Sequence, residues 1–239
     1  MARRRFFVPQ VRRGVAELTG DDAEHLVRVL RAEAGEIYEI SDNSSLYLAE
    51  IETARKSLVS FKVLEELAAP PDEAEIILLP ALIKFDRFEW IVEKATELGV
   101  SEIRPFEATR SERGLIKAAE KRRNRWERIA HEASEQARRH RLPTIGEASA
   151  FRDALDIKAG VKLMLDEDSQ TPLWKCLPEI RKVSDRVALL LGPEGGFTDE
   201  ERTEAHTHEW QSCSLGNTVL RAETAAAAGL AVVRAAWLS

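Results

Sequence analysis

The chain has 239 residues, of which 44% are apolar and 32% are charged, and its formal net charge is −6. This composition is typical of a globular protein long enough for two domains. Its only cysteines, Cys176 and Cys213, exclude a disulfide framework and a cysteine-rich zinc site. The basic N-terminus precedes no apolar stretch, and no apolar run is long enough to cross a bilayer. We therefore expect a reduced, cytosolic protein without a metal or a membrane anchor.

Residues 1–71 have the pattern of a small β-rich domain. Polar and apolar residues alternate over 35–40 and again over 46–51, and the segment Ser57-Leu-Val-Ser-Phe-Lys-Val-Leu predicts another strand. Between Thr19 and Arg31, apolar residues at helical spacing predict a short helix. Two consecutive prolines in the sequence Ala68-Ala-Pro-Pro-Asp then predict a linker, because proline interrupts regular structure.

From residue 72 to residue 239 the pattern becomes that of an α/β domain. The continuous apolar run Ile76-Ile-Leu-Leu-Pro-Ala-Leu-Ile predicts a strand that is buried on both faces. Further strands and helices alternate along the chain, which favours a mostly parallel sheet with helices on both faces. The predicted elements are a helix over 85–98, a strand over 100–106, a helix from about 118 to 139, and strands over 161–165 and 187–191.

Positive charge is concentrated in residues 104–141, which carry 12 lysines and arginines against 6 acidic residues. Such a run is often only the solvated face of a helix. Arginine also suits phosphate, because its planar guanidinium makes paired hydrogen bonds. We leave both interpretations open for Lys121, Arg122, Arg123, Arg125 and Arg128 in the middle of the predicted helix. Arg138, Arg139, His140 and Arg141 cluster at its end. For Arg139 and Arg141, RNA contact becomes the favoured interpretation once the resemblance described below is considered.

Two glycine-containing segments follow predicted strands. In Val187-Ala-Leu-Leu-Leu-Gly-Pro-Glu-Gly-Gly-Phe-Thr, a buried strand ends at Leu191 and a helix begins at Thr198, with Glu201 completing a capping box. In Leu215-Gly-Asn-Thr-Val-Leu-Arg-Ala-Glu-Thr-Ala, a loop enters an alanine-rich helix. Ligands of α/β proteins bind beyond the carboxyl ends of parallel strands, where glycine allows close approach to the backbone. Taken singly, each segment is also compatible with an ordinary turn.

Together and in this order, these segments resemble the RsmE family, whose members methylate N3 of a uridine in 16S ribosomal RNA and belong to the knotted SPOUT methyltransferases. The same resemblance extends over the whole chain through Arg5-Phe-Phe-Val-Pro, His25-Leu-Val-Arg-Val-Leu-Arg, Glu93-Lys-Ala-Thr-Glu-Leu-Gly-Val and Glu132-Ala-Ser-Glu-Gln-Ala-Arg-Arg-His-Arg-Leu-Pro. The chain departs from the family's usual pattern at Asn217-Thr218, where a basic pair is common, and at Arg138, where a small residue is common.

The resemblance implies a PUA-like β-barrel over 1–71 that aids RNA binding, and a SPOUT domain over 72–239 whose end forms a deep trefoil knot. It also implies a homodimer, the small ribosomal subunit as partner, and S-adenosyl-L-methionine as cofactor, held largely by backbone groups. The implied cofactor-binding residues are Leu191, Gly192, Pro193, Glu194, Gly195, Gly196, Leu215, Gly216, Leu220, Arg221, Glu223 and Thr224.

Uridine N3 carries a proton and is a poor nucleophile until that proton is removed or the resulting anion is stabilised. Arg221 and Arg139 are candidates for stabilising the anion. Glu223 or Glu194 can accept the proton, although either can instead anchor a loop, and the sequence names no general base. We expect Arg3, Arg4, Arg5, Arg139 and Arg141 to contact RNA phosphates.

Two other functions remain open, namely ribose 2′-O methylation on the same fold and RNA binding without catalysis in ribosome assembly. His206 and His208 make a poor metal chelate, because residues two apart on a helix face different directions. Neither a GxSxG nucleophile turn nor a GxGxxG dinucleotide motif occurs in a suitable context, which disfavours hydrolases and Rossmann-type enzymes.

Overall fold

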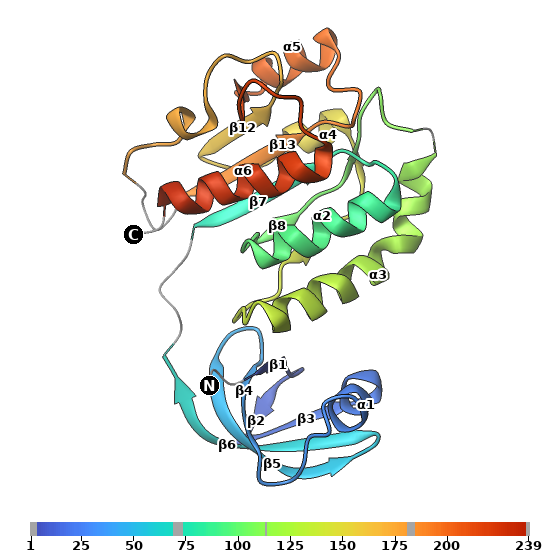
Figure 1. Cartoon of the computed structure of the whole chain (residues 1–239), viewed down its shortest axis with the longest axis vertical. Helices are drawn as coiled ribbons and strands as arrows, with labels where there is room; N and C mark the ends of the chain where they lie inside the picture. The colour runs from blue at the N-terminus through green and yellow to red at the C-terminus, as the bar shows by residue number, and fades with distance from the viewer. Residues whose placement is uncertain (1–3, 69–73, 113, 181–184, 238–239) are drawn as a thin grey trace. The chain divides into compact units, whose positions relative to one another are not determined.

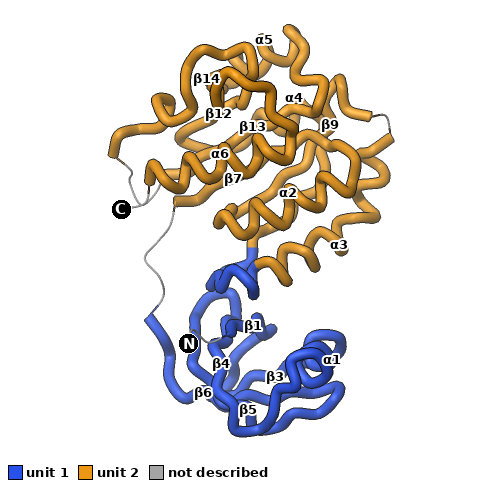
Figure 2. The backbone as a smooth tube through the Cα atoms, in the orientation of Figure 1, with its two compact units in different colours: residues 1–71, 134–142 blue, residues 72–133, 143–239 orange. Residues whose placement is uncertain are grey.

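The structure is a computed structural model that describes residues 4–68, 74–112, 114–180 and 185–237. The chain divides into two compact units (Figure 2). The β unit comprises Met1–Pro71 together with Ser134–Leu142, and the α/β unit comprises Asp72–Ala133 and Pro143–Ser239. The β unit thus includes a segment that lies more than sixty residues further along the chain than its first part.

The β unit is a mainly antiparallel sheet with one short helix, as the alternating pattern predicts. Its six strands lie in the order β1-β4-β5-β6-β3-β2, and only the β1–β4 pair is parallel. Helix α1 packs against β3, β5 and β6, and its apolar residues join the strands' buried residues in one core. The elements are β1 Arg5–Phe7, β2 Val11–Arg12, β3 Val15–Thr19, α1 Gly20–Arg28, β4 Ile37–Ser41, β5 Leu46–Arg55 and β6 Leu58–Leu67.

The α/β unit contains a six-stranded, entirely parallel sheet in the order β10-β8-β7-β13-β12-β14. Figure 1 labels its strands β7, β8, β12 and β13. Its strands are β7 Glu75–Pro80, β8 Glu102–Ile103, β10 Thr144–Ile145, β12 Val161–Leu165, β13 Arg186–Leu191 and β14 Gln211–Cys213, while β9 Phe106–Glu107 and β11 Ser149–Ala150 form a separate pair. The strand predicted over 100–106 is two short strands, because Pro105 lies between them and cannot donate to a ladder.

Helices cover both faces of the parallel sheet, and side chains alternate between two cores. Ile76 and Leu78 pack with residues of α2, α3 and α6, whereas Ile77 and Leu79 pack with residues of α4 and α5. This alternation explains the continuous apolar run, because both faces of β7 are buried. The helices are α2 Phe85–Glu97, α3 Leu115–Gln136, α4 Phe151–Leu155, the 3₁₀ turn η1 Leu173–Cys176, α5 Asp199–Thr207 and α6 Ala222–Trp237.

Helix α3 ends earlier than the sequence pattern predicts, at Gln136 rather than Arg139. Arg138 has a left-handed backbone conformation with φ 53°, and the Arg139 amide donates to the Ser134 carbonyl at 2.9 Å. This hydrogen bond closes the helix in the way that a glycine after a helix usually does. Because the left-handed residue is an arginine, the sequence carries no stop signal at this position.

Candidate functional site

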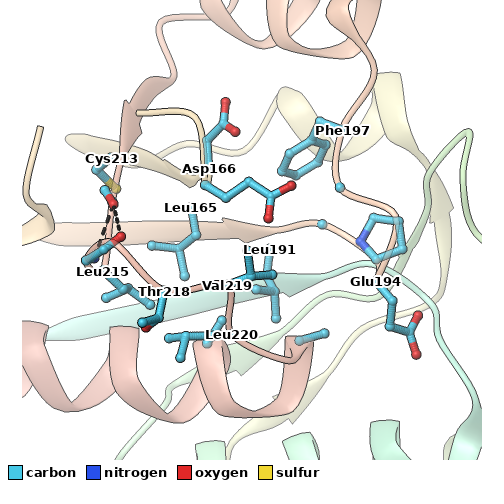
Figure 3. A pocket seen from close by; sticks show the side chains of 18 residues that line it. Leu165, Asp166, Leu191, Glu194, Phe197, Cys213, Leu215, Thr218, Val219 and Leu220 are labelled. Carbon is cyan, nitrogen blue, oxygen red and sulfur yellow. Dashed lines mark hydrogen bonds between the residues drawn. The ribbon is translucent and has the colours of Figure 1, made fainter. Parts of the chain in front are cut away.

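The carboxyl ends of β12, β13 and β14 meet at one edge of the parallel sheet. Leu165 pairs with Leu191 and with Cys213, so three loops begin side by side there. These loops enclose a cavity together with the start of α6 (Figure 3). Such an edge is where α/β proteins bind ligands, and the cavity is therefore the candidate functional site of the described residues.

Most of the residues that the sequence proposed for a ligand site line this cavity. The lining includes Leu191, Gly192, Pro193, Glu194, Gly196, Leu215, Gly216 and Leu220. Four proposed residues do not line it, namely Gly195, Arg221, Glu223 and Thr224. Arg221 and Thr224 are exposed, whereas Glu223 is half-buried and its Oε2 has no hydrogen-bond partner among the described residues.

The glycine loop after β13 is closely packed. A Cβ atom on Gly192 would lie 3.1 Å from the Phe197 ring, so only glycine fits without a shift. Gly196 has φ 67°, a conformation that favours glycine, and its amide donates to the Pro193 carbonyl at 2.9 Å. The loop therefore leaves backbone groups next to the cavity, with no side chain of its own at two positions.

The predicted capping box at the start of α5 is present. The Thr198 hydroxyl accepts from the Glu201 amide at 3.2 Å, and the Glu201 carboxylate accepts from the Thr198 amide at 2.9 Å. Glu201 is 4% exposed, and its other oxygen accepts from the Thr109 amide at 2.7 Å. The box thus also joins the glycine loop to the segment that follows β9.

Two arginines that the sequence interpretation missed hold the outer side of the glycine loop. Arg110 donates to the Gly195 carbonyl at 2.6 Å and to the Phe197 carbonyl at 3.2 Å. Arg87, in the first turn of α2, pairs with Glu194 at 2.9 Å. Neither arginine is near the loop in the sequence, so no local motif could have revealed these contacts. The pairing of Glu194 favours its interpretation as a loop anchor.

The loop after β12 also lines the cavity, and the sequence interpretation missed it. This loop begins at Asp166. Asp166 is buried, and both of its oxygens accept from the Arg202 guanidinium, at 2.9 and 3.2 Å. Hydrogen bonding to Asp166 is the largest cause that raises the pKa of Arg202. A helix residue of α5 therefore fixes the orientation of a cavity-lining carboxylate. Arg202 also pairs with the more exposed Asp168 and Asp199.

The loop after β14 leads into the alanine-rich helix α6, which lies close to the sheet. A Cβ atom on Gly229 would lie 3.0 Å from the Leu165 side chain, so the small residues permit the close packing that the sequence suggested. Cys213 is buried and its thiol lines the cavity; burial raises the pKa of this thiol. Both cysteines are free.

The arginines proposed for RNA contact differ in their surroundings. Arg3 lies outside the described residues, whereas Arg4 and Arg141 are exposed and Arg139 is half-buried. Arg5 is 9% exposed, and its Nη2 pairs with Glu39 at 2.7 Å. The Arg5 guanidinium thus already has partners inside the β unit, and this geometry does not favour the expected phosphate contact.

The arginines in the middle of α3 form ion pairs with carboxylates. Arg122 and Arg125 both pair with Glu89, at 3.2 and 2.6 Å. Arg123 pairs with Glu127 and Glu147, and Arg128 pairs with Glu132. These contacts favour the solvated, salt-bridged face over a nucleic-acid surface for this part of the helix.

The two arginines proposed to stabilise the uridine anion belong to different units. Arg139 belongs to the β unit and Arg221 to the α/β unit.

Comparison with known proteins supports the assignment of these units. Residues 70–234 match the family described as RNA methyltransferase domain, and residues 18–64 match the RNA methyltransferase PUA domain. The chain is 30% identical to Ribosomal RNA small subunit methyltransferase E of Bacillus subtilis, covering 92% of each chain. Against the protein of the same name from Synechocystis, the identity is 30%, covering 95% of this chain and 75% of the relative.

Solved structures are also similar over the whole chain. One is Ribosomal RNA small subunit methyltransferase E from Neisseria gonorrhoeae bound to S-adenosyl methionine, with a TM-score of 0.88, 28% identity and coverage of 99% and 98%. Another is a putative methyltransferase from Legionella pneumophila with bound cofactor, with a TM-score of 0.87, 30% identity and the same coverage. The chain belongs to the RNA methyltransferase family and, within it, to that of Ribosomal RNA small subunit methyltransferase E.

The membership confirms the resemblance that the sequence motifs suggested, including the α/β fold and the PUA-like N-terminal domain. No helix among the described residues is long and apolar enough to cross a membrane.

Proposed function

We propose that this protein transfers a methyl group from S-adenosyl-L-methionine to N3 of a uridine in the 16S ribosomal RNA of the small ribosomal subunit. The observation that carries this proposal is the cavity at the carboxyl ends of β12, β13 and β14, built by the family's two glycine-containing loops. Relatives that share these elements are named for methylation of small-subunit ribosomal RNA, and the Neisseria structure contains S-adenosyl methionine.

The cavity has the features that this cofactor requires. Apolar side chains of Leu191, Leu215 and Leu220 line it beside backbone groups of Gly192 and Gly196. Apolar walls suit an adenine ring, and backbone amides and carbonyls suit its nitrogen atoms. When bound, the cofactor supplies a methyl group on a positively charged sulfur. We propose that these residues hold it, with Asp166 as an acidic wall.

We propose that the protein's own residues prepare the uridine. A water-poor site with a positive guanidinium lowers the energy of the anion left when N3 loses its proton. Arg221 and Arg139 remain the candidates for this role. Glu223 is the better candidate for proton acceptance, because one of its oxygens has no partner among the described residues while Glu194 pairs with Arg87. N3 takes part in base pairing, so the target base must be unpaired or extruded.

We also propose that Arg4, Arg139 and Arg141 contact RNA phosphates, that the protein acts in the cytoplasm, and that it is a homodimer built on the α/β unit. Trp90, an exposed aromatic residue on α2, supports an interface there, since aromatic residues are enriched at interfaces. The resemblance to SPOUT proteins supports a trefoil knot at the chain's end, and domains over 1–71 and 72–239.

Nucleoside analysis tests the proposal. Small subunits from cells that lack this protein are incubated with the purified protein and cofactor, and the digested RNA is analysed by mass spectrometry. We expect N3-methyluridine. A 2′-O-methylated product would favour ribose methylation, and RNA binding without any methylated product would favour a non-catalytic assembly factor. Arg221→Ala and Arg139→Ala should each lower the single-turnover rate; full activity of both would remove the proposed role of these arginines.

A further inference from the structure

The basic segment that follows α3 is held in place by side chains of the β unit. The Ser41 hydroxyl donates to the His140 carbonyl at 2.6 Å, and the Leu142 amide donates to the Asn43 side-chain carbonyl at 2.7 Å. The Arg5 guanidinium donates to the Arg138 carbonyl. All three hydrogen bonds reach the main chain of the segment and fix its backbone conformation. Within the segment, the Arg139 side chain also donates to the Arg141 carbonyl at 3.2 Å.

The groups that hold the segment are themselves fixed. Ser41 is fully buried at the end of β4, and its hydroxyl accepts from the Asn43 amide at 3.0 Å. Arg5 is oriented by Glu39 on the paired strand, through Nε at 3.1 Å and Nη2 at 2.7 Å. A segment anchored in this way loses little conformational entropy when it binds a ligand, which favours affinity.

Arg138 occupies a backbone conformation that suits glycine better. Its φ is 53°, and the left-handed region is unfavourable for residues that carry a Cβ atom. Glycine is the usual residue at the position where a helix ends in this way. Within the basic segment, this left-handed position therefore holds a large, exposed, charged residue in place of the usual glycine.

We propose that Arg138–Arg141 is a preformed RNA phosphate site, that Arg138 is one of its phosphate ligands, and that Ser41, Asn43 and Arg5 are its positioning residues. The segment presents three arginines within four residues, with Arg138 and Arg141 exposed. Guanidinium groups bind phosphate oxygens through paired hydrogen bonds. This inference rests on the proposed function, because that function supplies the RNA partner. It also gives the β unit a specific task in RNA binding.

The first test replaces Arg138 with glycine and measures two quantities that should move in opposite directions. Arg138→Gly relieves the left-handed strain, so the melting temperature should rise by about 1–3 °C. Loss of one phosphate contact should reduce the slope of a plot of log association constant for small subunits against log salt concentration by about 0.7–0.9 in magnitude. At 0.15 M salt this corresponds to roughly 4- to 6-fold weaker binding to purified small subunits.

The β unit offers a matched control. Arg13 is also an exposed arginine with φ 53°, and it lies in the turn between β2 and β3. Arg13→Gly removes the same charge and relieves the same conformation, but outside the segment. We expect a similar rise in melting temperature and an unchanged salt slope. If Arg138→Gly keeps the parent's slope, or if both variants lose slope equally, the site assignment is wrong.

The second test addresses the positioning residues. Asn43 is exposed with φ 70°, so Asn43→Gly keeps the turn and removes only the acceptor for the Leu142 amide. We expect about 2- to 10-fold weaker binding to small subunits with an unchanged melting temperature. Asn43→Ser keeps a side-chain oxygen as acceptor without adding a charge beside the phosphate site, and it should recover part of this loss. Parent-like binding by Asn43→Gly would overturn the positioning role. Neither test uses catalysis, so failure of the methyl-transfer proposal would leave both results interpretable.

Discussion

The buried pair between Arg202 and Asp166 yields a quantitative prediction. Arg202→Met preserves the length and apolar character of the side chain but leaves the Asp166 carboxylate without its partner. The Asp166 side chain is 5% exposed and that of Arg202 is 19% exposed. Removing one partner of a buried pair costs about 3–5 kcal/mol, and the partial exposure of Arg202 places the expected loss near 3 kcal/mol. For a chain of this size, the melting temperature should fall by roughly 6–12 °C.

Urea unfolding followed by tryptophan fluorescence measures this loss directly, because Trp126, Trp210 and Trp237 are buried in the α/β unit. Asp199→Asn is the matched control. Asp199 also pairs with Arg202, but its side chain is 95% exposed, and such pairs contribute at most about 1 kcal/mol. Cofactor affinity, measured by calorimetry, should fall in Arg202→Met because Asp166 lines the cavity. A stability loss below about 1 kcal/mol would refute the reasoning, since it would mean that water already screens the pair.

Three further predictions concern the glycine loop, the packing of α6 against the sheet, and the cavity lining. Arg110→Met removes the hydrogen bonds to the glycine loop and should weaken cofactor binding, measured by calorimetry, about 10-fold, since hydrogen bonds from charged groups contribute about 1.5–3 kcal/mol. Unchanged affinity would show that the loop keeps its conformation without Arg110. Gly229→Val should lower the free energy of unfolding in urea by about 1–3 kcal/mol, because the larger side chain overlaps Leu165. Gly229→Ala should be nearly neutral, because the higher helix propensity of alanine offsets its milder overlap. Equal stability of the two variants would contradict this packing. Thr218→Trp, at a cavity-lining position, should block the cofactor, while Asn217→Trp next to it should not, and the reverse result would place the ligand elsewhere.

The parts of the fold that follow from local patterns could be predicted from the sequence. Strand β13 and the capping box of Thr198 and Glu201 were predicted correctly, because a buried strand and a helix start have clear residue signals. Strand β1 was not predicted, since the three residues Arg5–Phe7 are all buried and show no alternation. The end of α3 was placed too late because arginine, not glycine, takes the left-handed position.

The candidate site shows the same division. The two glycine-containing loops could be identified from their motifs, but the wall at Asp166 could not. Its partner Arg202 is 36 residues away in the sequence, and Arg110 is 85 residues from the glycine whose carbonyl it binds. Contacts of this kind depend on which strands become neighbours, and neither spacing nor composition encodes that in a single sequence. Gly195 belongs to the motif but does not line the cavity, so its contact with the cofactor stays a prediction.

The order of strands in the parallel sheet has a consequence for how the chain is made. Strand β7 pairs with β13, whose residues are synthesised 111 positions later, as in Glu75 and Arg186. Until then, one edge of β7 and its apolar run lack their final neighbour, and such edges are prone to aggregation. The segment Ser134–Leu142 likewise reaches the β unit only after 62 intervening residues have been added. During synthesis, neither unit can therefore be completed before residues from much later in the chain have been added. The yield of folded protein then depends on protecting β7 from aggregation as well as on the stability of the finished protein.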